Sequence, residues 1–212
     1  MVRRSLPISF LPRLHGASKL MKASRLALPL VLFVFSALAL GLVLFITLGR
    51  QPGTGVGGPF TLTNQAGQKV TEKALEGPGA SLVFFGFTHC PDVCPTALYE
   101  ITQVYQALGP KGDRLRTFFI TVDPERDAPD LLRDYISSFD PRIVGLTGTP
   151  EQATAALKAY RGYARKVPLE GGGYTMDHTA LVYLMDSKGR FIESFNLKRP
   201  PEEAAKEIQK YL

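Results

Sequence analysis

The 212-residue sequence is poor in the residues that build most metal and redox sites, because it holds only two cysteines and three histidines. A structural zinc ion usually takes four protein ligands, and the sequence offers no obvious set of four. The sequence also shows no phosphate-binding loop, no pair of catalytic acids and no serine triad pattern. These absences leave the few cysteines and histidines as the main carriers of chemistry.

Acidic residues are missing from the first 25 residues, although the whole chain has 25 lysines and arginines against 19 acidic residues. The basic residues of this N-terminal stretch are Arg3, Arg4, Arg13, Lys19, Lys22 and Arg25. The rest of the chain is balanced in charge, so the net charge of +6 belongs to the N-terminal stretch. Because the remainder has neither a basic stripe nor a zinc-finger pattern, we expect no binding to nucleic acid.

Residues 26–48 read LALPLVLFVFSALALGLVLFITL and carry no charge. A helix of ~20 apolar residues crosses a bilayer core, and the basic flank before it favours a cytoplasmic N-terminus. We therefore predict a basic cytoplasmic tail (1–25), a single-pass anchor in the cell inner membrane (26–48), and a flexible linker (49–58). The following domain would lie on the outer, periplasmic-side face. A cleaved signal peptide, which should have a shorter apolar region, is the alternative, and a mitochondrial inner-membrane location fits less well.

From residue 59 to residue 212 the pattern predicts one α/β domain with a mixed sheet and flanking helices. Its elements come in the order ββ, then alternating strands and helices, then ββα. Hairpins are predicted within 60–70 and 179–195, single strands at 80–85, 115–122 and 143–146, and helices at 95–108, 129–139, 150–160 and from 201 onward. No internal repeat is present.

The two cysteines, Cys90 and Cys94, lie at the turn between a predicted buried strand and a helix, and each is followed by proline. Open α/β sheets bind ligands in the crevice outside the carboxyl ends of their strands, where this turn would lie. Because Pro95 suits the first helical position, Cys94 is predicted to be the N-cap, where the helix dipole lowers a thiol pKa. The cysteine spacing differs from the two-residue gap of thioredoxin motifs. A purely structural disulfide is the alternative, but so small a ring contributes only about 2 kcal/mol.

His178 follows a glycine-rich loop and precedes a predicted strand. A lone histidine is more often structural than a ligand, but two thiolates with one imidazole suit copper, as Cu(I) or Cu(II). His89 is next to Cys90, and its side chain is expected to point away if the turn is extended. Asp123 ends a strand expected beside the cysteine strand, where it could orient a ligand or simply form a turn.

Four stretches in order resemble the Sco/SenC family of copper chaperones for cytochrome c oxidase assembly. They are GFTHCPDVCP (86–95), TVDPERD (121–127), VGLTGT (144–149) and DHTALVYLMDSKGRF (177–191). The resemblance implies a thioredoxin-like fold tethered to a membrane, with copper bound by Cys90, Cys94 and His178 and with Asp123 close by.

It also implies two kinds of partner: a copper donor protein and the oxidase subunit that holds the binuclear copper site. The alternative function is a thiol-disulfide oxidoreductase, in which Cys90 and Cys94 reduce the cysteines of the oxidase copper site before metallation. The resemblance fits both functions, so the sequence leaves the choice open.

Overall fold

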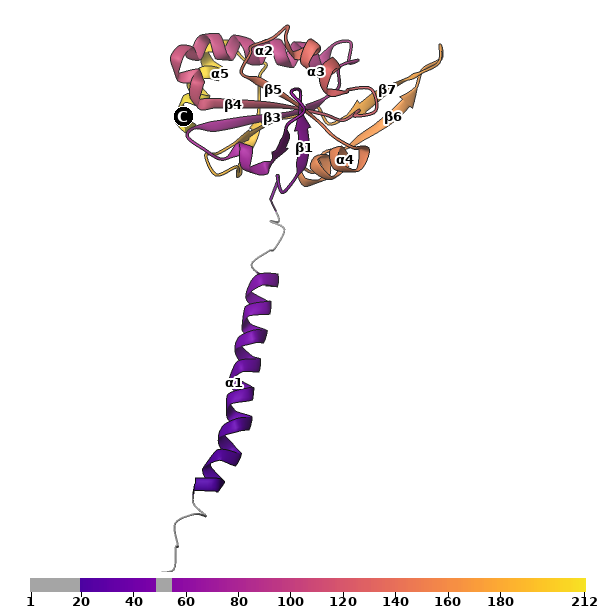
Figure 1. Cartoon of the computed structure of the whole chain (residues 1–212). Helices are drawn as coiled ribbons and strands as arrows, with labels where there is room; N and C mark the ends of the chain where they lie inside the picture. The colour runs from indigo at the N-terminus through magenta and orange to yellow at the C-terminus, as the bar shows by residue number, and fades with distance from the viewer. Residues whose placement is uncertain (1–19, 49–54) are drawn as a thin grey trace, which may run out of the picture. The chain divides into compact units, whose positions relative to one another are not determined.

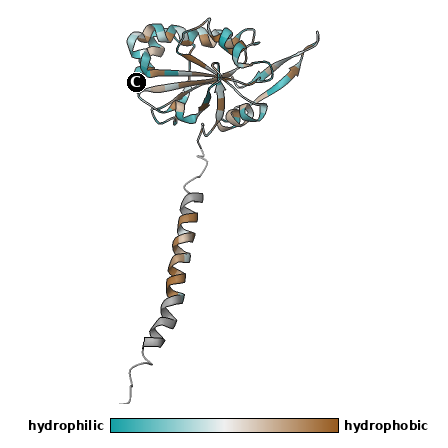
Figure 2. Cartoon of the chain, in the orientation of Figure 1, coloured by the Kyte–Doolittle hydropathy of each residue, from teal (hydrophilic) through white to brown (hydrophobic). Residues whose placement is uncertain are grey.

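The computed structural model describes residues 20–48 and 55–212, with side chains in the first segment described for residues 29–43. Contacts divide the chain into two units, residues 1–52 and 53–212. In the first unit, helix α1 spans Leu20–Leu48, and its described part is coloured mostly apolar in Figure 2. Within the described residues, no helix is both long enough and apolar enough to cross a membrane. The predicted tail and linker lie partly outside the described residues.

The second unit is built on a seven-stranded mixed sheet (Figure 1) with the strand order β2-β1-β5-β4-β3-β8-β9. The central strands β3, β4 and β5 run parallel, and the other pairs are antiparallel. Their bounds are β1 Thr61–Asn64, β2 Lys69–Thr71, β3 Ala80–Gly86, β4 Leu115–Thr121, β5 Ile143–Thr147, β8 Val182–Met185 and β9 Phe191–Phe195.

Helices cover both faces of this sheet. They are α2 Val93–Leu108, α3 Pro129–Ile136, α4 Pro150–Ala159 and α5 Pro201–Ile208, with short 3-10 turns η1 Glu72–Leu75, η2 Gly109–Arg114 and η3 Gln209–Tyr211. Helices α2 and α5 lie side by side (Figure 1). Successive residues of β3 point to opposite faces: Phe84 lies near the start of α2, whereas Phe85 packs on Tyr160, just after α4. All seven residues of β3 are buried, which explains its unbroken apolar run.

The local patterns predicted most elements correctly. The first hairpin forms with Leu62 opposite Val70, and Thr149 and Gln152 form the capping box at the start of α4. Two helix bounds were wrong by a few residues: α2 begins at Val93, and α3 ends at Ile136.

One hairpin was missed by the sequence analysis. Strands β6 (Ala164–Pro168) and β7 (Tyr174–His178) pair only with each other, in a two-stranded sheet separate from the large one. The predicted glycine-rich loop is the tip of this hairpin. His178 is therefore the last residue of a strand, and β8 begins only four residues later.

Candidate metal centre

The cysteine turn connects the buried end of β3 to helix α2. The backbone N–H of Cys90 donates to the Phe87 carbonyl at 3.2 Å. Both cysteines are free thiols and both are buried, Cys94 completely. The pKa of the Cys94 thiol is affected by the neighbouring Cys90 thiol. The structure therefore places both cysteines in one buried turn, directly beyond the carboxyl end of the central parallel strand β3.

The predicted helix cap was wrong. Asp92 is the N-cap, and Cys94 lies one residue inside the helix, at its second position. The predicted low thiol pKa was wrong as well, because burial raises the pKa of Cys94. A backbone hydrogen bond from Phe87 opposes this shift, whereas the neighbouring Cys90 and Asp127 add to it. Cys94 is therefore a protonated thiol at neutral pH without a metal, and a metal ion would have to displace that proton.

His178 faces the cysteine turn from the end of β7. Its Nε2 atom lies 3.8 Å from Cys94 Sγ, and its Nδ1 atom lies 3.1 Å from the Thr179 carbonyl oxygen. Since only a protonated Nδ1 can donate to a carbonyl, the hydrogen-bond network assigns the proton to Nδ1 and leaves the lone pair on Nε2. Burial lowers the pKa of His178, so the ring is neutral at pH 7. A neutral imidazole with a free Nε2 is the form that binds metals.

The distance between these two atoms suits a shared ion. Metal ions lie about 2.0–2.3 Å from imidazole nitrogen and thiolate sulfur, so two such ligands of one ion are roughly 3.5–4 Å apart. The 3.8 Å between Cys94 Sγ and His178 Nε2 lies in this range. No cluster of three or more His, Cys, Asp or Glu side chains within the described residues is arranged to hold a metal. The structure thus brings Cys94 and His178 together, but the three predicted ligands do not form a complete ligand cage.

Within the described part of the chain, no hydrogen bond links Asp123 to the cysteines or to His178. Asp123 is 1% exposed. One carboxylate oxygen accepts from the Tyr174 hydroxyl at 2.9 Å, and the other pairs with Arg126. Tyr174 is the first residue of β7, so Asp123 contacts the strand that carries His178.

Asp127 is the residue that the sequence analysis missed. It is completely buried and accepts three hydrogen bonds, from the Thr88 backbone N–H at 3.0 Å, the Thr88 hydroxyl at 2.6 Å and the Thr121 hydroxyl at 2.6 Å. It therefore fixes the cysteine turn to the end of β4. His89 lies 3.9 Å from the same carboxylate, so this histidine is directed toward Asp127. A second acid four residues after Asp123 was the only signal in the sequence.

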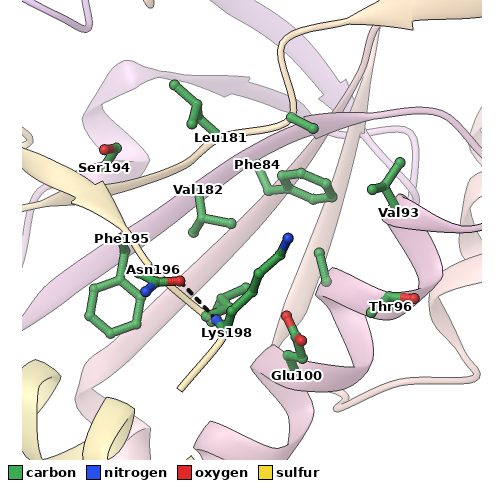
Figure 3. A pocket seen from close by; sticks show the side chains of 13 residues that line it. Phe84, Val93, Thr96, Glu100, Leu181, Val182, Ser194, Phe195, Asn196 and Lys198 are labelled. Carbon is green, nitrogen blue, oxygen red and sulfur yellow. Dashed lines mark hydrogen bonds between the residues drawn. The ribbon is translucent and has the colours of Figure 1, made fainter.

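A groove of about 310 Å³ lies beside the cysteine turn (Figure 3). Its lining includes the apolar residues Phe84, Val182 and Phe195. Val93, next to Cys94, and Leu181 are both exposed large apolar residues at this groove. The surface beside the thiols is therefore more apolar than polar, as is typical of a surface that contacts a partner.

The unit that carries this site is similar to known proteins in sequence and in fold. The SCO1/SenC family matches residues 49–212. The structure of Bradyrhizobium japonicum ScoI with copper bound is 55% identical, with a TM-score of 0.72, and the match covers 74% of this chain and 100% of that one. Yeast Sco1 with copper bound is 37% identical, with a TM-score of 0.66 and coverage of 74% and 91%.

The curated relatives are longer proteins. The human protein named SCO1 homolog, mitochondrial, is 38% identical over 164 residues, which are 74% of this chain and 53% of that protein. The chain thus spans about half the length of the first curated relatives that it matches. The similarity in sequence and in fold covers the unit that carries the cysteine turn and His178.

Proposed function

The chain belongs to the SCO1/SenC family, and from this premise we propose that it binds copper as cargo for the binuclear copper site of cytochrome c oxidase. The proposed ligands are Cys90, Cys94 and His178, all in the domain of residues 59–212. A copper donor protein would supply the ion, and the copper-site subunit of the oxidase would receive it.

One observation carries this proposal: the lone pair of His178 Nε2 lies 3.8 Å from Cys94 Sγ, and Nδ1 is held by the Thr179 carbonyl. Thiolates select Cu(I), and imidazole also suits Cu(II). A bound cation would oppose the effect of burial on the pKa of the Cys94 thiol, because the charge of the ion stabilises the thiolate. The donor set is therefore compatible with copper in either oxidation state.

The test is an anaerobic titration of the full chain in detergent with Cu(I), in competition with a chromophoric chelator. His178→Ala should weaken binding by more than the ~10–100-fold that is typical for loss of a residue that merely orients a ligand. His89→Ala is the matched control, because His89 is next to Cys90 and is directed toward Asp127. Undiminished affinity in His178→Ala, or an equal loss in His89→Ala, would contradict the proposed ligand set.

The second candidate is a thiol-disulfide oxidoreductase, and the two free thiols in one turn favour it. In that reaction Cys90 and Cys94 would pass two electrons and two protons to a disulfide of the oxidase subunit. They would become a disulfide themselves, and a dithiol reductant would restore them. If oxidase assembly survives His178→Ala but fails with Cys90→Ser or Cys94→Ser, this candidate replaces the copper proposal.

We also propose that residues 26–48 anchor the chain in the cell inner membrane, with the copper-binding domain on the outer, periplasmic-side face. The uncharged run and the basic flank before it support this topology. Carbonate extraction should leave the full chain in the membrane fraction. Protease added to the outer side should degrade the domain, and protection from that protease would contradict the orientation.

A further inference from the structure

We propose that Arg126 is a positioning residue for His178, because it binds the first residue of β7 from the loop that follows β4. This inference rests on the proposed copper function, since it concerns the residue that presents the imidazole to the ion. Arg126 itself is expected to touch neither the metal nor the cysteines.

The contacts of Arg126 converge on Tyr174, the first residue of β7. Its Nε atom pairs with the Asp123 carboxylate, and its Nη1 atom donates to the Tyr174 carbonyl at 2.9 Å. The guanidinium also lies over the Tyr174 ring, 3.9 Å from its centroid. The Tyr174 hydroxyl closes the group by donating to Asp123 at 2.9 Å. The pair of Arg126 and Asp123 thus contacts the backbone carbonyl, the ring and the hydroxyl of Tyr174.

This attachment matters because the β6–β7 hairpin has no pairing with the large sheet. An isolated two-stranded hairpin is marginally stable in water, so its position depends on contacts with the rest of the domain. At its other end, the Thr179 backbone N–H donates to the Tyr163 carbonyl at 2.9 Å, which only continues the pairing of the hairpin's own strands. Tyr174 and His178 are four residues apart on one strand, so their side chains lie on the same face. Fixing Tyr174 therefore fixes the strand that delivers His178.

A second connection runs through Phe87 in the cysteine turn. The Arg126 guanidinium carbon lies 5.9 Å from the Phe87 ring centroid, and the Phe87 ring meets the His178 ring edge to face at 5.7 Å. Arg126 thus contacts both the strand that carries the imidazole and the ring that packs against it. Its Nη2 atom is buried without a hydrogen-bond partner in the described part of the chain, so stacking on Tyr174 helps to set its position. Lysine keeps the charge but loses the planar fork and the stacking.

The experiment uses the full chain in detergent and compares Arg126→Lys and Tyr174→Phe with the control Lys166→Gln. Lys166 is a matched control because its ammonium also lies over the Tyr174 ring, at 4.7 Å, but in an exposed ion pair with Glu125. Arg126→Lys should weaken Cu(I) binding about 10–100-fold, the usual effect of losing a residue that orients a metal ligand. Tyr174→Phe should cause a smaller loss, and Lys166→Gln should cause none.

A double-mutant cycle shows whether Arg126 acts through the imidazole. The loss caused by Arg126→Lys should disappear in the His178→Ala background. An equal loss in both backgrounds would mean a general structural effect and would overturn the proposal, as would an equal effect of Lys166→Gln. Thermal unfolding checks that each variant is folded, and Tyr174→Phe carries the test if Arg126→Lys does not fold.

A second readout does not depend on copper. The chain has only three histidines, so selective ¹⁵N-histidine NMR of the metal-free chain resolves them. Arg126→Lys should shift or broaden the His178 ring nitrogens and leave those of His89 unchanged. Unchanged His178 resonances would overturn the positioning role. If His178→Ala binds copper as tightly as the wild type, the proposed ligand set fails, and this spectrum still decides the role of Arg126.

Discussion

Gly86 offers a direct test of how tightly the cysteine turn is packed. It is the last residue of β3, and its carbonyl accepts from the Val122 N–H at 2.8 Å. A Cβ atom at this position would lie 2.5 Å from Phe119 Cε2 and 2.8 Å from Cys94 Sγ. Phe119 and Cys94 are both completely buried, so any shift of either side chain moves it within the packed interior. Gly86→Ala therefore forces the ring, the sulfur or the strand to shift.

The size of the effect follows from this overlap. Adding a methyl group to a well-packed core usually costs about 1–3 kcal/mol. Alanine in a strand recovers roughly 0.5–1 kcal/mol relative to glycine, so we expect a net destabilisation of about 1–2 kcal/mol. The effect on copper should be larger than this stability loss suggests, because ligands must be held within about 0.5 Å of the productive geometry, and the inserted methyl group would push directly on Cys94 Sγ.

Urea denaturation of the metal-free chain, followed by circular dichroism, measures the loss of stability, and chelator competition measures copper affinity. Gly171→Ala is the control, because a Cβ there meets no atom within 4 Å and the backbone is not in the left-handed region. We expect Gly171→Ala to match the wild type in both assays. If Gly86→Ala also matches the wild type in stability and copper affinity, the described packing of Cys94 against the strand is incorrect.

Three further predictions concern single contacts. Asp127→Ala should lower the free energy of unfolding by about 3–5 kcal/mol, because it leaves the donors of Thr88 and Thr121 unpaired; a loss below about 1 kcal/mol in urea would contradict this. Burial lowers the pKa of His178, so below pH 6.5 the unfolded chain binds more protons than the folded chain does. The melting temperature of the metal-free chain should therefore fall as the pH drops from about 7.5 to 5. His178→Gln should flatten this fall. Thr149→Ala removes the side-chain cap of α4 and should cost about 1 kcal/mol of stability, with copper affinity unchanged.

The parts of the fold that follow from short-range pattern were predictable. The buried run of β3 and the capping box at Thr149 carry their signal within a few residues. The β6–β7 hairpin does not, because Arg165 and Lys166 are exposed neighbours and break the alternation that identifies a half-buried strand. Its strands are held by contacts with residues far away in the sequence, such as Arg126.

The candidate site was predictable in composition but not in its electrostatics. The motif and the resemblance brought Cys90, Cys94 and His178 together as a hypothesis, and the structure places Cys94 beside His178. The position of Cys94 suggested a helix dipole and a low pKa, but complete burial outweighs the dipole. Asp127 was missed because an acid is usually solvated, and only the fold shows the three donors that surround it.

The pairing of β8 with β3 has a practical consequence for labelling this protein. Val182, four residues after His178, pairs with Phe84, which precedes the cysteine turn, so this backbone ladder and the Tyr174 contacts together set the span between the two halves of the site. The tip at residues 169–173 is exposed, and exposed tips of this kind accept inserted sequence best. A fluorescent peptide inserted there would report on the chain during the proposed copper transfer while leaving that ladder intact.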